Sequence, residues 1–130
     1  MSKRLLALIL FFMILFPLSI QAKSVYETEW QRSSCYSGIE FKLVVYEPDR
    51  GSSNQLARLF IRNRYQEAVS VSYKFDVNGK TADGRTNTIS PREEVSGGAW
   101  TLIPISNYFS GSATISKLQV RGSNSYRSCD

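Results

Sequence analysis

The segment from Ala68 to Val77 (AVSVSYKFDV) alternates apolar and polar residues with a strict period of two. Its apolar residues are Val69, Val71, Tyr73, Phe75 and Val77. Alternation with one polar face is typical of an antiparallel sheet that has one side in water. Asn78-Gly79 follows directly and favours a type I′ hairpin, because both central residues of that turn need a positive φ. The segment therefore predicts a half-buried strand that ends in a hairpin turn.

Five further strands are predicted along the chain, where short apolar runs alternate with turn residues. They cover residues 38–47, 56–63, 85–89, 99–104 and 112–121, with turns at 48–53, 83–84, 90–91 and 97–98. The side chains predicted to face the core are Ile39, Phe41, Leu43, Val45, Ala57, Leu59, Ile61, Trp100, Leu102, Ala113, Ile115, Leu118 and Val120. In the last strand, Ala113 and Ile115 are at odd positions and Leu118 and Val120 are at even ones. This shift in the alternation predicts a β-bulge near Ser116-Lys117.

No segment after residue 23 shows a helical period of apolar residues. Six or seven strands at a spacing of about ten residues are typical of a β-sandwich. The chain length fits one domain. We therefore predict an all-β fold, a single antiparallel β-sandwich over residues 23–130, with a small closed β-barrel as the alternative.

The segment from Thr88 to Glu94 (TISPREE) resembles the strand-to-turn step L-x-P-G-E of immunoglobulin-like and fibronectin type III-like domains. Arg92 stands where those domains usually have glycine. The antibody-type pattern of two cysteines bracketing a tryptophan is not met, because both cysteines lie near the ends of the domain. The resemblance implies an immunoglobulin-like sandwich and transfers no functional residue, since that fold has many unrelated roles.

Residues 1–22 are interpreted as a signal peptide. Lys3 and Arg4 form a positive n-region, residues 5–18 are almost wholly apolar, and Ala22 supplies a small residue at the cleavage site. The apolar run is shorter than the roughly 20 residues of a spanning helix, so no transmembrane anchor is expected after processing. Cleavage removes two cations and no acid, which lowers the formal charge from +5 to +3. The processed chain is expected to be secreted or periplasmic.

Cys35 and Cys129 are the only cysteines, so one intramolecular disulfide is possible. Export would place them in an oxidising compartment, where disulfides persist. Their wide separation argues against a redox-active pair, which usually has close spacing such as C-x-x-C. We predict a structural bridge that closes nearly the whole domain and holds its C-terminus.

The sequence contains no histidine. This excludes Ser-His-Asp and Cys-His nucleophile pairs, His-bearing zinc sites and an imidazole general base. Asp76, Asn78 and Asp83 resemble a calcium loop only superficially, because Lys80 occupies a ligand position. The chain also lacks a run of Lys or Arg that would follow a phosphate backbone. We therefore expect no enzymatic activity, no metal or other cofactor and no nucleic-acid partner.

A candidate contact surface lies on the predicted strand 56–63. If one face of this strand is buried, its arginines and its phenylalanine point outward, and the next strands would add Lys42, Val44, Tyr46 and Lys74. We expect a hairpin around residues 64–67 to make strand 68–77 a direct neighbour. Arginine and aromatic side chains are enriched in binding hot spots. The candidate residues are Arg58, Phe60, Arg62, Arg64, Tyr65 and Lys74.

These residues favour a non-enzymatic binding module that contacts a protein or an anionic or glycan surface through a basic and aromatic sheet face. A solvated sheet face is the simpler interpretation, with arginine stems covering Phe60. A carbohydrate-binding module of the cell envelope and a structural subunit that assembles by sheet-edge pairing are the functional alternatives. Trp100 is expected in the core and Trp30 over one end of the sandwich. The sequence leaves the oligomeric state open.

Overall fold

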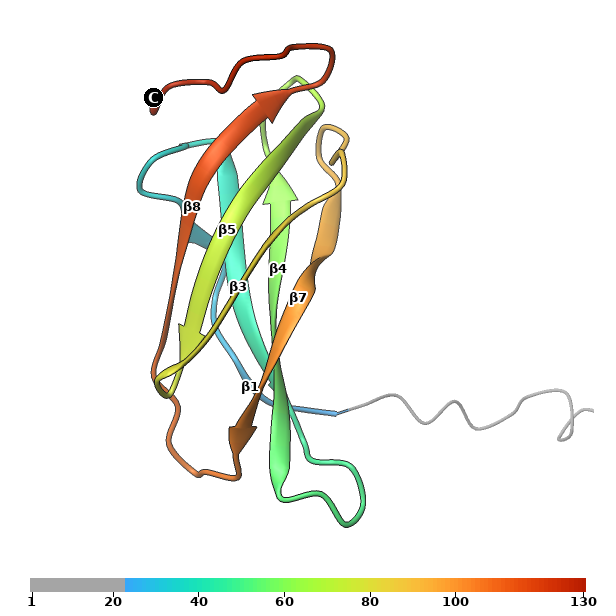
Figure 1. Ribbon diagram of the computed structural model, residues 1–130, viewed down its shortest axis with the longest axis vertical. Coiled ribbons are helices and arrows are strands. Elements are labelled where there is room, and N and C mark those ends of the chain that lie inside the picture. The colour runs from blue at the N-terminus through green and yellow to red at the C-terminus, as the bar shows by residue number, and fades with distance from the viewer. Residues whose placement is uncertain (1–22) are drawn as a thin grey trace, which may run out of the picture.

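The computed structural model describes residues 23–130, and the predicted signal peptide lies outside the described residues. This range forms two antiparallel sheets that pack face to face (Figure 1). The larger sheet has the order β1-β3-β4-β7, with β2 also paired to β3, and the smaller has the order β6-β5-β8. The strands are β1 (Ser24–Glu27), β2 (Gln31–Arg32), β3 (Ile39–Tyr46), β4 (Asn54–Asn63), β5 (Val69–Val77), β6 (Lys80–Arg85), β7 (Glu94–Pro104) and β8 (Gly111–Val120). The predicted all-β sandwich is confirmed.

Residues 23–130 contain no helix that could cross a membrane.

The alternation along β5 is confirmed, because its five apolar side chains are all buried while Lys74 is exposed. The predicted hairpin is confirmed as well. Asn78 and Gly79 have φ values of 53° and 84°, and Val77 pairs with Lys80 across the turn. The Gly79 N–H donates to Asp76 Oδ1 at 3.0 Å, which stabilises the turn.

The core lies between the inner faces of the two sheets. β3 and β4 pair with their buried residues aligned, as in the pairs Phe41–Ile61 and Leu43–Leu59. The buried apolar residues that form this core are Tyr36, Ile39, Phe41, Leu43, Val45, Ala57, Leu59, Ile61, Val69, Val71, Tyr73, Phe75, Val77, Ile89, Ile103, Ile115 and Leu118. Burial of apolar area at about 25 cal/mol per Å² is the main stabilising contribution to such a fold. The predicted inner faces of β3, β4 and β5 are therefore correct.

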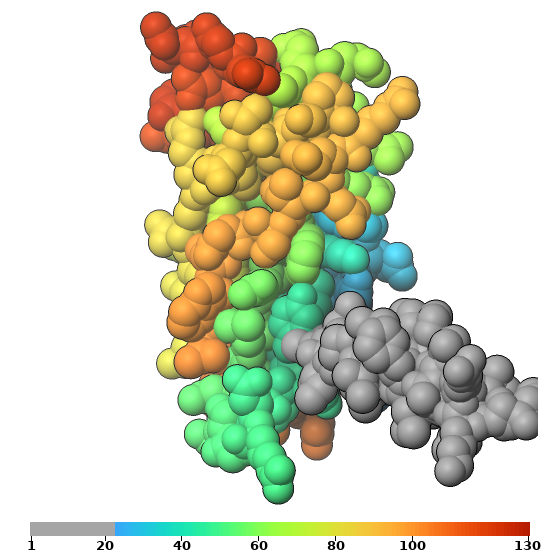
Figure 2. Space-filling view, turned by 90° about the vertical axis from the view of Figure 1, so that its right-hand side faces the viewer, coloured from blue at the N-terminus to red at the C-terminus, as the bar shows by residue number. Residues whose placement is uncertain are grey.

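The two sheets come together along β6 and β7, which lie side by side in Figure 2 as the yellow and orange segments. Tyr73 reaches from β5 to this seam, where its hydroxyl oxygen accepts a hydrogen bond of 2.8 Å from the Ala99 N–H. A Cβ atom would lie 2.6 Å from the same oxygen at Gly97 and 2.8 Å at Gly84. Only glycine fits at these two positions, because the Tyr73 ring occupies the space a side chain would need.

Two of the predicted turns are wrong, since both glycine signals lie inside strands. Asp83-Gly84 belongs to β6, because the tight hairpin keeps β5 and β6 paired as far as Ser72 and Arg85. Gly97-Gly98 belongs to β7 and lies next to the register shift of the β4–β7 pair. At both places glycine marks the close approach of Tyr73 and not a reversal of the chain.

The predicted strand at residues 85–89 is also wrong, because β6 ends at Arg85 and only Ile89 forms a bridge, with Val69. The buried Thr86 makes the two hydrogen bonds to the Val71 backbone that a continued β6 strand would otherwise make. Its N–H donates to the Val71 carbonyl at 2.9 Å, and its Oγ1 accepts from the Val71 N–H at 3.0 Å. The short strands β1 and β2, which the sequence did not predict, both pair with β3.

The predicted bulge in the last strand is confirmed. Ser72 pairs with Lys117 and Tyr73 pairs with Ile115, so Ser116 is the extra residue of β8. The bulge lets Ile115 and Leu118 both point into the core although their spacing is odd.

The predicted disulfide between Cys35 and Cys129 is confirmed, with the two Cα atoms 4.7 Å apart. Next to the disulfide, hydrogen bonds of Asp130 hold the C-terminal segment in place. The Asp130 N–H donates to the Cys35 carbonyl at 3.0 Å, and the Asp130 carboxylate accepts from the Ser37 N–H at 2.8 Å and from the Tyr65 hydroxyl at 2.6 Å. These contacts attach the C-terminal residue to the loop that precedes β3 and to Tyr65 after β4.

Candidate functional site

Arg58, Phe60 and Arg62 lie on the outer face of the larger sheet, as the period of two predicts. They alternate along β4 with three fully buried residues, Ala57, Leu59 and Ile61. Each of the three outer side chains is half-buried, because neighbouring strands flank β4 on both sides. Their surroundings are therefore set by the register with β3 and β7.

Arg58 lies at the centre of an apolar surface. It pairs with Val44 of β3 on one side and with Trp100 of β7 on the other. Directly opposed residues share a face, with Cβ atoms about 4.5–5.5 Å apart. Leu56 is opposed by Leu102 in the same way. We call this surface the Arg58 face. Its partly or fully exposed residues are Leu56, Arg58, Phe60, Trp100 and Leu102, and the buried Val44 borders Arg58.

The prediction that Trp100 and Leu102 belong to the core is wrong, because the two residues are 54% and 47% exposed. On β7 the side of the strand that faces inward carries Ala99, Ile103 and the other residues at every second position from them. Tyr73 fills the space beneath this part of β7, so small residues occupy the inward positions and the large ones point out. The small residues at Gly97 and Ala99 were the sequence signal for this arrangement.

The charge of Arg58 is not compensated within the described chain. No carboxylate of residues 23–130 lies within 4.0 Å of its guanidinium group. The residues directly across from it on both sides are apolar, so the charge lies in a partly desolvated environment. A half-buried cation among aromatic and aliphatic side chains favours a partner that supplies a carboxylate or another anionic group.

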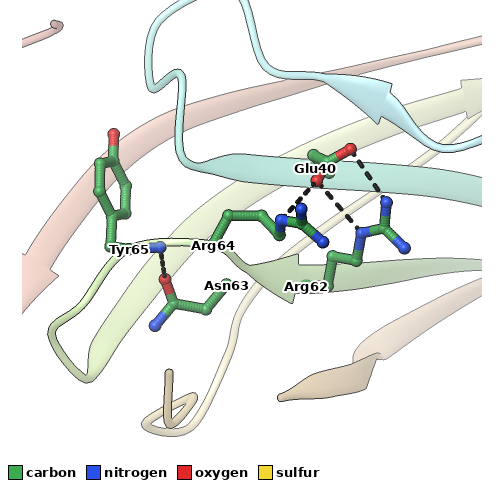
Figure 3. Close-up of polar contacts among 5 residues, drawn as sticks. All are labelled: Glu40, Arg62, Asn63, Arg64 and Tyr65. Carbon is green, nitrogen blue, oxygen red and sulfur yellow. Dashed lines mark hydrogen bonds and ion pairs between the residues drawn. The ribbon is translucent and has the colours of Figure 1, made fainter. Parts of the chain in front are cut away.

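Arg62 and Arg64 differ from Arg58, because both pair with Glu40 of β3 (Figure 3). Arg62 Nε and Nη2 donate to the two carboxylate oxygens at 3.2 and 3.1 Å, and Arg64 Nε lies 3.4 Å from Oε1. The hydrogen bonds from Arg62, more than the neighbouring charges, hold the pKa of Glu40 below its ordinary value of 4.5. These two predicted site residues therefore already have an anionic partner.

Trp30 packs on the same outer face and does not cover an end of the sandwich. Its ring centroid lies 4.3 Å from Arg62 Cζ and 5.0 Å from Lys42 Nζ. Lys42 also lies 5.7 Å from the Phe60 ring centroid and 2.5 Å from Glu27 Oε1. Aromatic rings and carboxylates thus hold the cations next to the Arg58 face, which favours a rigid surface.

A hollow of about 460 Å³ lies next to Arg62 and Arg64, beside the turn before β7. Arg62, Arg64 and Arg92 contribute to its lining together with Gln66 and Glu94. Arg62 and Arg64 share the Glu40 carboxylate, and Glu94 lies directly across from Arg62 in the β4–β7 ladder, so part of the positive charge there is already compensated. The hollow is a weaker candidate for an anionic ligand than the Arg58 face.

Tyr65 lies apart from the predicted site and points away from Glu40 (Figure 3). Its ring packs against Gly38, and the Arg127 guanidinium lies 4.9 Å from the ring centroid. Burial, together with the hydrogen bond to Asp130, raises the pKa of the Tyr65 hydroxyl above its ordinary value of 10.0. This residue anchors the C-terminus and is not part of the Arg58 face.

Lys74 is not a neighbour of the other candidates, so the predicted pairing of strands 56–63 and 68–77 is wrong. β4 belongs to the larger sheet and β5 to the smaller one. The chain crosses between the sheets after Asn63, whose side chain donates to the Glu67 carbonyl at 2.7 Å and to the Ile89 carbonyl at 3.0 Å. These buried hydrogen bonds stabilise a corner in place of a hairpin.

Over residues 23–130 no group of three or more acidic or cysteine side chains is arranged to hold a metal ion. Asp76 instead stabilises the turn at Gly79. No family model, no curated protein and no solved structure matches this chain.

Proposed function

We propose that this chain is an exported, non-enzymatic binding module that contacts an acidic protein segment through the Arg58 face. The observation that carries the proposal is the uncompensated charge of Arg58 between Val44 and Trp100. A partner that combined a carboxylate with aromatic or aliphatic side chains would neutralise this cation and cover the apolar residues around it.

The exposed side chains of β7 support this choice. Trp100 and Leu102 point outward on a strand that lies at the edge of the larger sheet. Tryptophan and arginine are the residue types most enriched in binding hot spots, because they bury a large area and keep directed hydrogen bonds. Since the neighbouring cations are already paired, an acidic partner would gain most from Arg58.

The export part of the proposal is supported by the disulfide between Cys35 and Cys129, which is typical of oxidising compartments. The finer fold assignment, an immunoglobulin-like or fibronectin type III-like sandwich, is supported by two features. The strands β4, β5 and β7 alternate between the sheets. Arg92, at the position where the resemblance expects glycine, has a φ of 66°, which is the conformation that favours glycine.

The experiment is a selection of phage-displayed peptides on the disulfide-bonded chain. We expect enriched peptides to place Asp or Glu next to an aromatic or leucine residue. Arg58→Glu should weaken their binding by about tenfold or more, and Trp100→Ala should do the same.

Arg64→Glu is the matched control, because it makes the same charge change just after the end of the same strand, at a residue that already pairs with Glu40. We expect this variant to change the affinity by less than about threefold. Equal losses for Arg58→Glu and Arg64→Glu, or selected peptides without acidic residues, would contradict the proposal. Circular dichroism confirms that each variant is folded.

A further inference from the structure

The outer face of the smaller sheet carries a second hollow, on the opposite side of the sandwich from the Arg58 face. It has a volume of about 630 Å³ and is open to solvent. Strands β5 and β8 of this sheet lie in front in Figure 1. The lining residues come from β5, β6 and β8 and are mostly cationic or hydroxyl-bearing: Ser72, Tyr73, Lys74, Asp83, Gly84, Arg85, Thr114, Ser116 and Lys117.

Register brings three cations together here. Ser72 at the centre of the sheet pairs with Arg85 on β6 and with Lys117 on β8. Two residues further along β5, Lys74 lies between Asp83 and Thr114 on the same two strands. Lys74 is thus a member of this cluster, although the sequence assigned it to the Arg58 face.

The positive charge of the cluster is poorly compensated. None of the three cations takes part in an ion pair within the described range, although Asp83 is adjacent. Arg85 is held by neutral acceptors instead: Ser70 Oγ at 3.1 Å, Gln119 Oε1 and the Tyr126 hydroxyl at 3.4 Å. The like charges of Lys74, Arg85 and Lys117 on one sheet face repel one another, and a bound anion would relieve the repulsion.

An aromatic ring lies at the border of the hollow. Lys117 Nζ is 5.0 Å and Arg85 Cζ is 5.7 Å from the ring centroid of Tyr126, a residue that is 52% exposed. Within residues 23–130, none of the other exposed large apolar side chains lines the hollow. The hollow therefore offers cations, hydroxyl groups and one aromatic ring, with no apolar wedge that would enter a lipid layer.

We propose that this hollow binds an anionic saccharide, one whose rings carry sulfate or carboxylate groups. Lys74, Arg85 and Lys117 contact the anionic groups, the hydroxyls of Ser72 and Thr114 bond to ring oxygens or hydroxyls, and the Tyr126 ring stacks on a sugar. The site is distinct from the Arg58 face and does not depend on the function proposed for that face.

The test uses isothermal titration calorimetry of the disulfide-bonded chain with a heparin-derived octasaccharide. We expect binding that weakens as the ionic strength rises, and at least a fivefold lower affinity for a neutral oligosaccharide of equal length. The double variant Lys74→Glu/Lys117→Glu should weaken binding by about tenfold or more. The milder Lys74→Gln/Lys117→Gln should weaken binding by a smaller factor in the same direction.

The matched control is Lys23→Glu/Arg50→Glu, which makes the same change in net charge at two exposed residues away from the hollow. This control should retain the affinity within about twofold. Equal weakening by both double variants would overturn the site, because binding would then follow net charge. Two further results would overturn the choice of ligand: equal affinity for the neutral saccharide, or binding to phosphatidylglycerol vesicles that depends on Lys74 and Lys117 while the octasaccharide does not bind. Arg58→Glu should leave octasaccharide binding unchanged.

Discussion

The hydroxyl oxygen of Tyr73, on β5 of the smaller sheet, accepts a hydrogen bond from the backbone N–H of Ala99, on β7 of the larger sheet. This bond joins the two sheets along the seam where β6 and β7 meet. It also explains the two glycines next to the ring, since a Cβ atom at Gly84 or Gly97 would lie within 2.8 Å of the Tyr73 oxygen. The side chain of one core residue thus determines the residue types allowed on two other strands.

Removing this hydroxyl should destabilise the protein. Tyr73→Phe keeps the ring and leaves the Ala99 N–H without its acceptor, so the free energy of unfolding should fall by about 1–3 kcal/mol. Gly97→Ala should cost about 1–3 kcal/mol through steric overlap with the ring. Urea denaturation measures both changes. In the double variant the two losses should not add, because both act on one contact, and full additivity would contradict this account.

Replacing Arg92 by glycine should stabilise the protein. Arg92 has a φ of 66°, a left-handed conformation that costs a non-glycine residue roughly 1–2 kcal/mol. Glycine removes this strain but adds freedom to the unfolded chain, so we expect a net gain of about 0.5–1 kcal/mol in the thermal or urea unfolding transition. Arg50→Gly, at an exposed turn residue without a positive φ, is the control and should lower stability slightly. A loss for Arg92→Gly would contradict the strain argument.

Glu40 should make stability depend on pH. Its pKa is lowered in the folded protein, chiefly by the Arg62 hydrogen bonds, so the folded state binds this proton less readily than the unfolded chain. The stabilisation is therefore complete above the ordinary pKa of 4.5 and is lost as the pH falls through the lower folded value. Urea unfolding across this window should show a steeper acid loss for the wild type than for Glu40→Gln. Asp130, whose pKa is lowered by the Tyr65 hydrogen bond, contributes in the same direction and remains in the variant. Parallel acid limbs would rule out a role for Glu40.

The disulfide should contribute strongly to stability. It joins residues 94 positions apart, and closing a loop of that length stabilises a fold by about 4–5 kcal/mol when the unfolded chain is taken as flexible. Cys35→Ser/Cys129→Ser should lower the free energy of unfolding by about this amount. Hydrogen exchange should also become faster at the N–H groups that hold the C-terminus, such as that of Asp130. A change below about 1 kcal/mol would show that the remaining contacts of Asp130 and Tyr65 are sufficient.

The sequence predicted the strands whose apolar residues occur with a clean period of two. Residues of β3, β4 and β5 were assigned to the correct faces, because alternation reports burial directly when one side of a sheet is in water. The bulge at Ser116 was predictable for the same reason, since Ile115 and Leu118 cannot share a face without an extra residue. Glycine was less informative, because a turn and a close approach require it equally.

The candidate site was predicted only in part. Arg58 and Phe60 lie where the alternation placed them, but Trp100 was assigned to the core because it follows Gly97-Gly98 in an apolar segment. The packing of Tyr73 against β7 decided otherwise. Lys74 was placed beside the arginines because consecutive strands often form a hairpin, whereas the chain crosses here to the second sheet.

Local patterns of residues therefore determined the positions of β3, β4, β5 and β8, the faces of these regular strands and the single disulfide that two cysteines allow. The tertiary structure decided which strands lie side by side, and with them the composition of each surface. The physical reason is range: alternation and turn chemistry act between neighbours along the chain, while sheet assignment depends on how side chains such as Tyr73 and Asn63 fill space and bond across the core. Only that packing places Arg58 next to Trp100 and gathers Lys74, Arg85 and Lys117 on the opposite face.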